Sequence, residues 1–293
     1  EMFGMQAALY CPSGTMTNQI ALRVATRPQD EVICDKRSHI YLYEGGGMAY
    51  NSMLSPKLLD GDRGRLTADL VANNINDPAD IHLPRTRLVG LENTMNKGGG
   101  CIYDINDIRK IKKVCEQNDL WLHLDGARLF NALVETQEKP SEYGVLFDSI
   151  SICFSKGLGA PIGSVLLGSN EIIREAKRVR KVLGGGMRQV GYLAAACLYA
   201  LDHHVDRLQE DHARAKVLGQ AMAEKSFVKE VLPVETNIVI AELEDVSPQE
   251  LLKSLEASGL SAVPFGPAAI RFVTHLGFDD NQLDEAVVII KNS

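Results

Sequence analysis

The chain has 293 residues, of which 45% are hydrophobic and 24% are charged, and its formal net charge is −7 at pH 7. This composition is typical of a globular protein with one large and one smaller domain, and an acidic balance without a basic patch argues against nucleic acid as a partner. No apolar run approaches the roughly 18 residues of a membrane-spanning helix, so we expect no membrane partner either.

The cysteines and histidines are spread along the chain without the spacing of metal ligands. The six cysteines contain no CxxC pair, and the seven histidines form no HExxH motif. We therefore expect reduced core cysteines in a cytoplasmic protein, and no bound metal.

The predicted elements alternate between helix and strand over most of the chain. Ser13 can cap a helix that carries Met16, Ile20 and Val24 on one face. The pattern further predicts a helix over 105–115 and strands over 32–34, 88–91, 120–125, 149–154 and 165–167. Such alternation is typical of an α/β protein with a mostly parallel central sheet and helices on both faces.

The last third of the chain predicts a small α+β domain. One long helix is expected over 187–224, with His203, His204 and His212 on its surface. It is followed by a strand near 237–241, a helix near 248–258, a strand near 269–273 and a helix near 282–291. We predict a large domain over 1–206 and a small C-terminal domain over 207–293. Because the chain begins at Glu1 with residues typical of the middle of a domain, we also expect an N-terminal segment to be missing.

Two charged residues stand where predicted apolar strands end. Asp125 follows one strand and Lys156 follows another, within a segment rich in glycine. Ligands of open parallel sheets bind beyond the carboxyl ends of the strands. Pyridoxal 5′-phosphate (PLP) requires a lysine that binds it covalently and a carboxylate on its ring nitrogen. The pair therefore predicts a PLP site, with a structural salt bridge between the two residues as the alternative.

Three further features could complete such a site. Ser13, Gly14 and Thr15 lie at a predicted helix start, where free N–H groups favour a phosphate, although a plain helix cap would look the same. His39 could stack on a pyridine ring or be an ordinary polar residue. Arg271, on an apolar strand, requires an anionic partner, either the carboxylate of an amino acid or a local acidic side chain.

Taken together, these segments resemble the threonine aldolases, which belong to the fold-type-I PLP enzymes. The resemblance covers essentially the whole chain, in the right order. The matching motifs are Pro12-Ser13-Gly14-Thr15-Met16, His39-Ile40-Tyr41 with the following triple glycine, Leu91-Glu92-Asn93-Thr94, His123-Leu124-Asp125-Gly126-Ala127-Arg128, Phe154-Ser155-Lys156-Gly157-Leu158-Gly159-Ala160-Pro161, Gly184-Gly185-Gly186-Met187-Arg188-Gln189 and Arg271-Phe272-Val273-Thr274-His275-Leu276.

The resemblance implies how the cofactor is held. Lys156 binds PLP covalently, Asp125 pairs with the ring nitrogen, Arg128 lies near the phenolic oxygen of the ring, and His39 stacks on the ring. Gly14 and Thr15 bind the phosphate.

The resemblance also implies an assembly and a substrate. Arg271 grips the carboxylate of a small amino-acid substrate, and Arg188 reaches the phosphate of a neighbouring subunit. Family members are typically homotetramers with active sites at subunit interfaces, so a homotetramer is expected here.

The sequence departs from the family pattern in two places. Met95 stands where the best-studied members have a histidine near the β-hydroxyl group of the substrate, and a thioether cannot accept that proton. The catalytic base is therefore either His39 or a bound water. The N-terminal segment that helps to complete the carboxylate site in the family is also absent from the sequence.

The expected reaction is PLP-dependent aldol cleavage of L-threonine or L-allo-threonine to glycine and acetaldehyde. The alternative is another PLP reaction on the same scaffold, such as β-elimination or racemisation of an amino acid. A nucleotide-binding protein is disfavoured because no GxGxxG motif follows the first strands.

Overall fold

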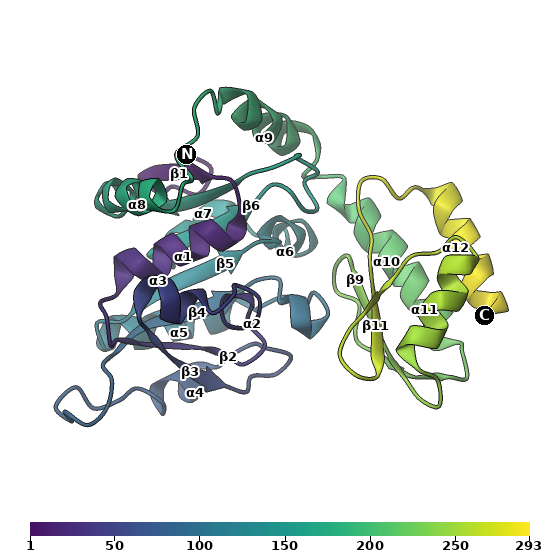
Figure 1. Ribbon diagram of the computed structural model, residues 1–293, viewed down its shortest axis with the longest axis horizontal. Coiled ribbons are helices and arrows are strands. Elements are labelled where there is room, and N and C mark those ends of the chain that lie inside the picture. The colour runs from purple at the N-terminus through teal and green to yellow at the C-terminus, as the bar shows by residue number, and fades with distance from the viewer.

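The computed structural model describes residues 1–293, which form a larger lobe and a smaller C-terminal lobe (Figure 1). The larger lobe is built on a seven-stranded sheet in the order β1-β7-β6-β5-β4-β2-β3. Strands β3, β2, β4, β5 and β6 are parallel, whereas β7 and β1 run antiparallel to their neighbours. In chain order the strands are β1 (Ala7–Cys11), β2 (Glu31–Asp35), β3 (Ser55–Leu59), β4 (Thr86–Glu92), β5 (Trp121–Gly126), β6 (Ser149–Cys153) and β7 (Ser164–Gly168).

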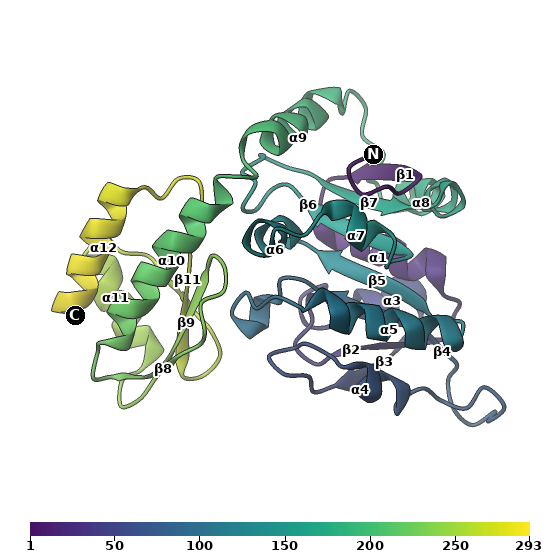
Figure 2. The ribbon, with the colours of Figure 1, turned by 180° about the vertical axis from the view of Figure 1, so that it is seen from behind.

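Helices cover both faces of this sheet. In Figures 1 and 2, α1 and α3 lie on one face and α5 and α7 on the other, while α9 lies beyond the β1 edge. The helices of this lobe are α1 (Gly14–Ala25), α2 (His39–Leu42), α3 (Gly47–Ser52), α4 (Ala68–Ala72), η1 (Asn96–Gly98), α5 (Ile105–Gln117), α6 (Leu129–Thr136), α7 (Pro140–Gly144), α8 (Asn170–Val182) and α9 (Gly191–His203). Both faces of the central strands are therefore buried, which explains why β2 and β6 have no exposed position.

The smaller lobe has its own sheet and its own core. Its antiparallel strands have the order β10-β11-β9-β8. The elements are α10 (Leu208–Ala223), β8 (Val228–Val231), β9 (Ile238–Leu243), α11 (Pro248–Ala257), β10 (Val263–Pro264), β11 (Ala269–Val273) and α12 (Asp280–Asn292). Residues from α10, β9, β11, α11 and α12 share one apolar cluster, which packs helices against one face of the sheet.

The predicted fold class is confirmed, and one predicted element is wrong. The helix expected over 187–224 is two helices, α9 and α10, separated by a turn at 204–207. The turn coincides with a tertiary contact, because the Nδ1 atom of His204 lies 2.6 Å from the carbonyl oxygen of Leu158. His212 is also not a surface residue: it is 1% exposed and lies between Glu135 and Asn131. The sequence near these histidines contains no signal for contacts with residues so distant along the chain.

Several smaller expectations can be compared with the structure. The six cysteines are buried and unpaired, as predicted. None of the helices is both long and apolar enough to pass through a bilayer. The division of the chain near Asp206 stays a prediction.

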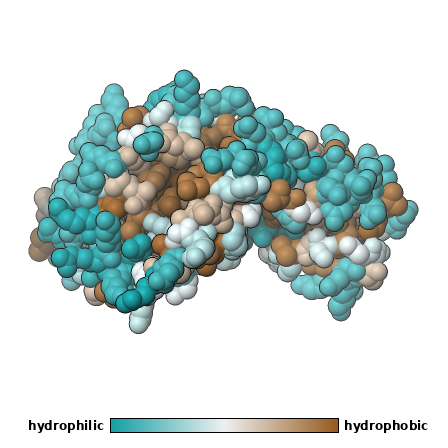
Figure 3. Space-filling view, turned by 90° about the horizontal axis from the view of Figure 1, so that it is seen from above, coloured by the Kyte–Doolittle hydropathy of each residue, from teal (hydrophilic) through white to brown (hydrophobic).

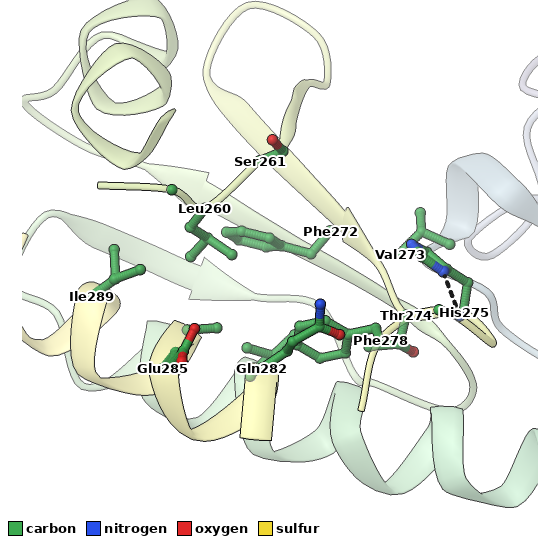
Figure 4. A pocket seen from close by; sticks show the side chains of 14 residues that line it. Leu260, Ser261, Phe272, Val273, Thr274, His275, Phe278, Gln282, Glu285 and Ile289 are labelled. Carbon is green, nitrogen blue, oxygen red and sulfur yellow. Dashed lines mark hydrogen bonds between the residues drawn. The ribbon is translucent and has the colours of Figure 1, made fainter. Parts of the chain in front are cut away.

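Two hollows lie outside the predicted site. Figure 3, seen from the side of α9, shows apolar side chains gathered in a hollow of the larger lobe, and a cavity of about 610 Å³ there is lined by residues such as Phe3, Phe154 and Leu198. A cavity of about 320 Å³ lies in the smaller lobe between β11 and α12, lined by Phe272, Phe278 and other residues (Figure 4). None of the predicted site residues lines either cavity.

Candidate active site

The predicted acid and lysine lie at the carboxyl ends of two adjacent parallel strands. Asp125 in β5 stands opposite Ser151 in β6, and Lys156 follows the end of β6 by three residues. Asp125 is 3% exposed, whereas Lys156 is half-buried. The Lys156 amine forms no salt bridge with Asp125, whose two oxygens accept hydrogen bonds from Asn18 and the Ala127 N–H instead. The structural salt bridge considered as an alternative is therefore absent.

Helix α1 lies over both strand ends. Its Thr17 hydroxyl is 2.5 Å from the Ser151 hydroxyl, and the amide of Asn18 donates to Asp125 over 2.8 Å. Ser13 is the N-cap of this helix, since its hydroxyl accepts a hydrogen bond from the Met16 N–H. The free N–H groups of the first turn are a ready anion site at the same edge of the sheet as Lys156. Gly14 and Thr15 occupy this first turn, as predicted.

Glu44 organises the carboxylate cluster of the site. Its side chain is completely buried and accepts hydrogen bonds from Asn18 and Gln19. The Nδ1–H of His39 donates to the same carboxylate over 3.0 Å, so the Nε2 atom remains free. This contact raises the pKa of His39, because the Glu44 carboxylate stabilises the imidazolium ion.

The ligand atoms of His39, Glu44 and Asp125 lie within 4.8 Å of one another. That spacing would suit a cation, but the hydrogen bonds just described account for the grouping, and no ion is needed to explain it.

Sequence reasoning missed Glu44 as a functional residue, although one local signal was available. Gly47 allows a close approach to α1, because a Cβ atom on it would lie 2.5 Å from the Gln19 side chain. A glycine shortly after an acidic residue can therefore mark a place where backbone and side chains pack closely.

His123 keeps Asn18 in place. Its Nε2 atom lies 3.1 Å from the Asn18 side-chain oxygen, and its Nδ1 atom lies 2.8 Å from the Ser149 hydroxyl. Complete burial lowers the pKa of His123 to about 4, so the ring is neutral near pH 7. A neutral ring donates through Nε2 to Asn18, and the Asn18 amide group is then directed at Asp125 and Glu44.

Glu92, at the end of β4, connects two parts of the site. One carboxylate oxygen accepts the His39 N–H over 2.7 Å, and the other accepts the Asn96 N–H over 2.9 Å. Burial raises the pKa of Glu92 from 4.5 to about 7, and the nearby Asp125 charge acts in the same direction. Glu92 thus fixes the backbone of His39 and Asn96 together.

Two arginines of the site have nitrogen atoms without partners. The Nε atoms of Arg128 and Arg271 are both buried and form no hydrogen bond. Burial lowers the pKa of each guanidinium, and for Arg128 the neighbouring charge of Arg271 lowers it further. Neighbouring cations whose buried Nε atoms lack acceptors indicate a place for an anionic or electron-rich ligand.

Two predicted residues lie apart from this cluster. Arg188 is exposed, in the turn between α8 and α9, and forms no hydrogen bond or salt bridge with the other predicted residues. Met95 is fully buried, and a Cβ atom on Gly64 would lie 2.5 Å from its terminal methyl group, so its side chain packs beneath the loop that contains Gly64.

The residues present fit PLP. The cofactor has a ring nitrogen, a phenolic oxygen and a phosphate, and it requires an amine. A buried carboxylate, a guanidinium whose buried Nε atom has no partner, a free helix N-terminus and a half-buried lysine without an acidic partner match these four groups. The Ser164 hydroxyl, buried close to Gly14, is a further polar atom without a partner.

Comparisons with known proteins agree with this geometry. The family model described as beta-eliminating lyase matches residues 1–246. The chain is 43% identical over 247 residues to the low-specificity L-threonine aldolase of Candida albicans, which covers 83% of this chain and 65% of that protein. It is 38% identical to low-specificity L-threonine aldolase 1 of Arabidopsis thaliana, with 94% of this chain and 79% of that protein covered.

A solved structure shows the same fold. The threonine aldolase of Leishmania major superposes with a TM-score of 0.84 at 22% identity, covering 98% of this chain and 84% of that one. The superposition supports the fold-type-I architecture, and the sequence relatives support the family. The chain therefore belongs to the beta-eliminating lyase family of PLP-dependent enzymes and, within it, to the threonine aldolases.

Proposed function

We propose that this protein cleaves L-threonine and L-allo-threonine to glycine and acetaldehyde. One observation carries the proposal: Asp125, Lys156 and the start of α1 converge at one edge of the sheet, beside two guanidiniums with buried unpaired Nε atoms. The names of the relatives, low-specificity L-threonine aldolases, support the same reaction.

The residues that would hold PLP have separate roles. When bound, PLP supplies an electron sink that stabilises negative charge at Cα of an amino acid. Lys156 holds the cofactor covalently, and Asp125 keeps its ring nitrogen protonated. Arg128 binds the phenolic oxygen, and Ser13, Gly14 and Thr15 at the start of α1 bind the phosphate.

Arg271 binds the α-carboxylate of the substrate. Its guanidinium is half-buried and has no acidic partner in the chain, so a local aspartate or glutamate does not satisfy it. A carboxylate from solution would form charge-assisted hydrogen bonds with it, which are stronger than bonds between neutral groups.

His39 is the best-placed group to remove the proton of the β-hydroxyl. Its Nδ1–H is held by Glu44, so Nε2 can accept a proton while the ring keeps its orientation. Met95 cannot act as a base, and its side chain is buried against Gly64. His39 would also stack on the cofactor ring, as the family resemblance implies.

We further propose a cytoplasmic homotetramer. The six unpaired cysteines support a reducing compartment. The apolar hollow beside α9 supports association of subunits, because an exposed apolar surface is costly in a monomer. Arg188 supports it as well, because it is exposed and forms no hydrogen bond or salt bridge within its own chain.

The products formed from L-threonine test the proposed reaction. We expect glycine and acetaldehyde in equal amounts, and less than about 1% of this activity in Lys156→Ala, since the lost covalent step is worth several orders of magnitude. 2-Oxobutyrate with ammonia would instead indicate β-elimination, and D-allo-threonine would indicate racemisation at Cα. Either outcome, or full activity of Lys156→Ala, would overturn the proposal.

A further inference from the structure

The guanidinium of Arg271 is held by two neighbours that are not acidic. Its Nη1 atom donates to the side-chain oxygen of Asn96 over 2.9 Å. The ring of Phe265 lies against the guanidinium, with the central carbon 5.1 Å from the ring centroid. The first contact fixes the group in its plane and the second restrains the tilt of that plane.

This arrangement leaves one edge of the guanidinium free. A carboxylate binds an arginine side-on through Nε and one Nη atom. Asn96 accepts a hydrogen bond from Nη1 only, whereas the Nε and Nη2 atoms of Arg271 make no hydrogen bond within the chain. The two donors that remain are therefore the pair that matches the two oxygens of a carboxylate.

Asn96 is itself anchored to both lobes. Its N–H donates to Glu92 at the end of β4. The glycine loop that follows is tied to the smaller lobe, because the Thr236 hydroxyl donates to the Gly100 carbonyl over 2.8 Å. The Asn96 side chain thus reaches Arg271 on β11 from a fixed position between the large sheet and the small one.

We propose that Asn96 is the positioning residue that turns the Nε–Nη2 edge of Arg271 toward the substrate carboxylate, with Phe265 holding the plane. The inference rests on the proposed role of Arg271. A neutral amide suits this role, because an acidic residue here would neutralise the guanidinium and compete with the substrate, whereas Asn96 orients it and leaves its charge available. Asn96 therefore determines affinity for amino acids over simple amines.

Titration of the PLP-loaded enzyme with two probes tests this inference. Glycine carries the carboxylate and methylamine does not, and the binding of each is followed by the visible absorbance of the cofactor. In Asn96→Ala we expect the Kd for glycine to rise about tenfold and the Kd for methylamine to change by less than about twofold. The KM for threonine should rise by a similar factor, with kcat reduced less than about threefold.

A matched control removes the same kind of bond elsewhere. Arg109 donates from Nη1 to the Asn106 side-chain oxygen over 2.8 Å on the exposed face of α5. Asn106→Ala should leave both Kd values within about twofold of the wild type, as expected for a surface contact. Phe265→Leu, which keeps an apolar side chain without the π face, should weaken glycine binding about threefold and serves if Asn96→Ala does not fold.

The outcomes separate this inference from the proposed function. An unchanged glycine Kd in Asn96→Ala and in Phe265→Leu would overturn the positioning role, and equal losses for glycine and methylamine would show a merely structural one. If the wild type bound glycine but formed no acetaldehyde from threonine, the proposed reaction would fail while the inference on Asn96 could still be tested.

Discussion

Two polar clusters in this protein differ in whether the buried atoms of their side chains all have hydrogen-bond partners. The cluster between α6 and α10 is closed: His212 contacts Glu135 and Asn131 through its two ring nitrogens, and Lys216 pairs with Glu135 over 2.9 Å. The cluster at the β5 and β6 ends is open. Its carboxylates have donors from the chain, but the buried Nε atoms of two arginines have no acceptor.

The difference separates a structural network from a functional one. Buried polar groups of folded proteins are nearly always satisfied, and a partly satisfied network is costly. The closed cluster stabilises the contact between the lobes. The open cluster keeps donors unpaired at the place where the cofactor and the substrate carboxylate are proposed to bind, so we expect its variants to lose activity more than stability.

Removal of one charge from the open cluster should have the largest effect. Asp125→Asn keeps the shape of the side chain but cannot hold the ring nitrogen protonated. We expect kcat/KM for threonine to fall at least about a hundredfold, with the thermal midpoint lowered by only a few degrees. Steady-state kinetics and calorimetry check this, with the exposed Asp60→Asn as the control. A hundredfold loss that merely followed unfolding would contradict the assignment.

Removal of a donor to that charge should have a smaller effect. Asn18→Ala takes one hydrogen bond each from Asp125 and Glu44. We expect about a tenfold loss of kcat/KM and a loss of about 1–3 kcal/mol in the free energy of unfolding. Urea unfolding measured beside the kinetics gives both values. Unchanged kcat/KM with a lowered free energy of unfolding would show that Asn18 has a structural role and no role in activity.

A substitution in the closed cluster should lower stability and leave activity almost unchanged. His212→Ala leaves the Asn131 side-chain oxygen without a partner and Glu135 with Lys216 alone, so we expect a loss of about 1–3 kcal/mol in the free energy of unfolding and a change of less than about threefold in kcat/KM. The same two assays compare it with Asn18→Ala. If His212→Ala lost more activity than Asn18→Ala, the distinction between the clusters would be wrong.

The smallest expected effect is the change of the free energy of unfolding with pH that Glu92 of the open cluster causes. The pKa of Glu92 rises from 4.5 to about 7 on folding, so the folded state binds its proton more tightly than the unfolded state. Its contribution to stability is therefore complete below about pH 4.5 and is lost as the pH rises through about 7. His123, whose pKa falls to about 4, acts in the opposite direction between about pH 4 and 6.5.

The contribution of Glu92 must therefore be isolated as a difference between proteins. We expect the free energy of unfolding of the wild type, minus that of Glu92→Gln, to decrease between about pH 4.5 and 7. Urea unfolding at a series of pH values measures this difference. A difference that stayed constant, or that increased with pH, would contradict the protonation state assigned to Glu92.

The sequence predicted most of the fold because its signals are local. The cap at Ser13, the apolar Val32-Ile33-Cys34 run within β2, and the charged residues at the strand ends are each visible within a few positions of the chain. Asp125 lies at the end of β5 and Lys156 follows the end of β6, and these two strands pair in parallel, so both residues lie at one edge of the sheet. Their roles toward the cofactor stay a prediction.

What the sequence could not show depends on contacts between distant residues. The turn between α9 and α10 coincides with a contact between His204 and Leu158, and neither residue is unusual in its local context. Glu44 is one acidic residue among many until the fold places it beside Asn18 and His39. Asn96 likewise becomes interpretable only when β11 brings Arg271 next to it.

The attachment point of the cofactor tests the central claim most directly. Reduction of the PLP-loaded protein with borohydride makes the cofactor–lysine bond permanent, and peptide mass spectrometry then locates it. We expect the added mass on the peptide that contains Lys156 and on no other lysine. Attachment elsewhere, or a protein that takes up no cofactor once its assembly is established, would contradict a PLP site at the ends of β5 and β6.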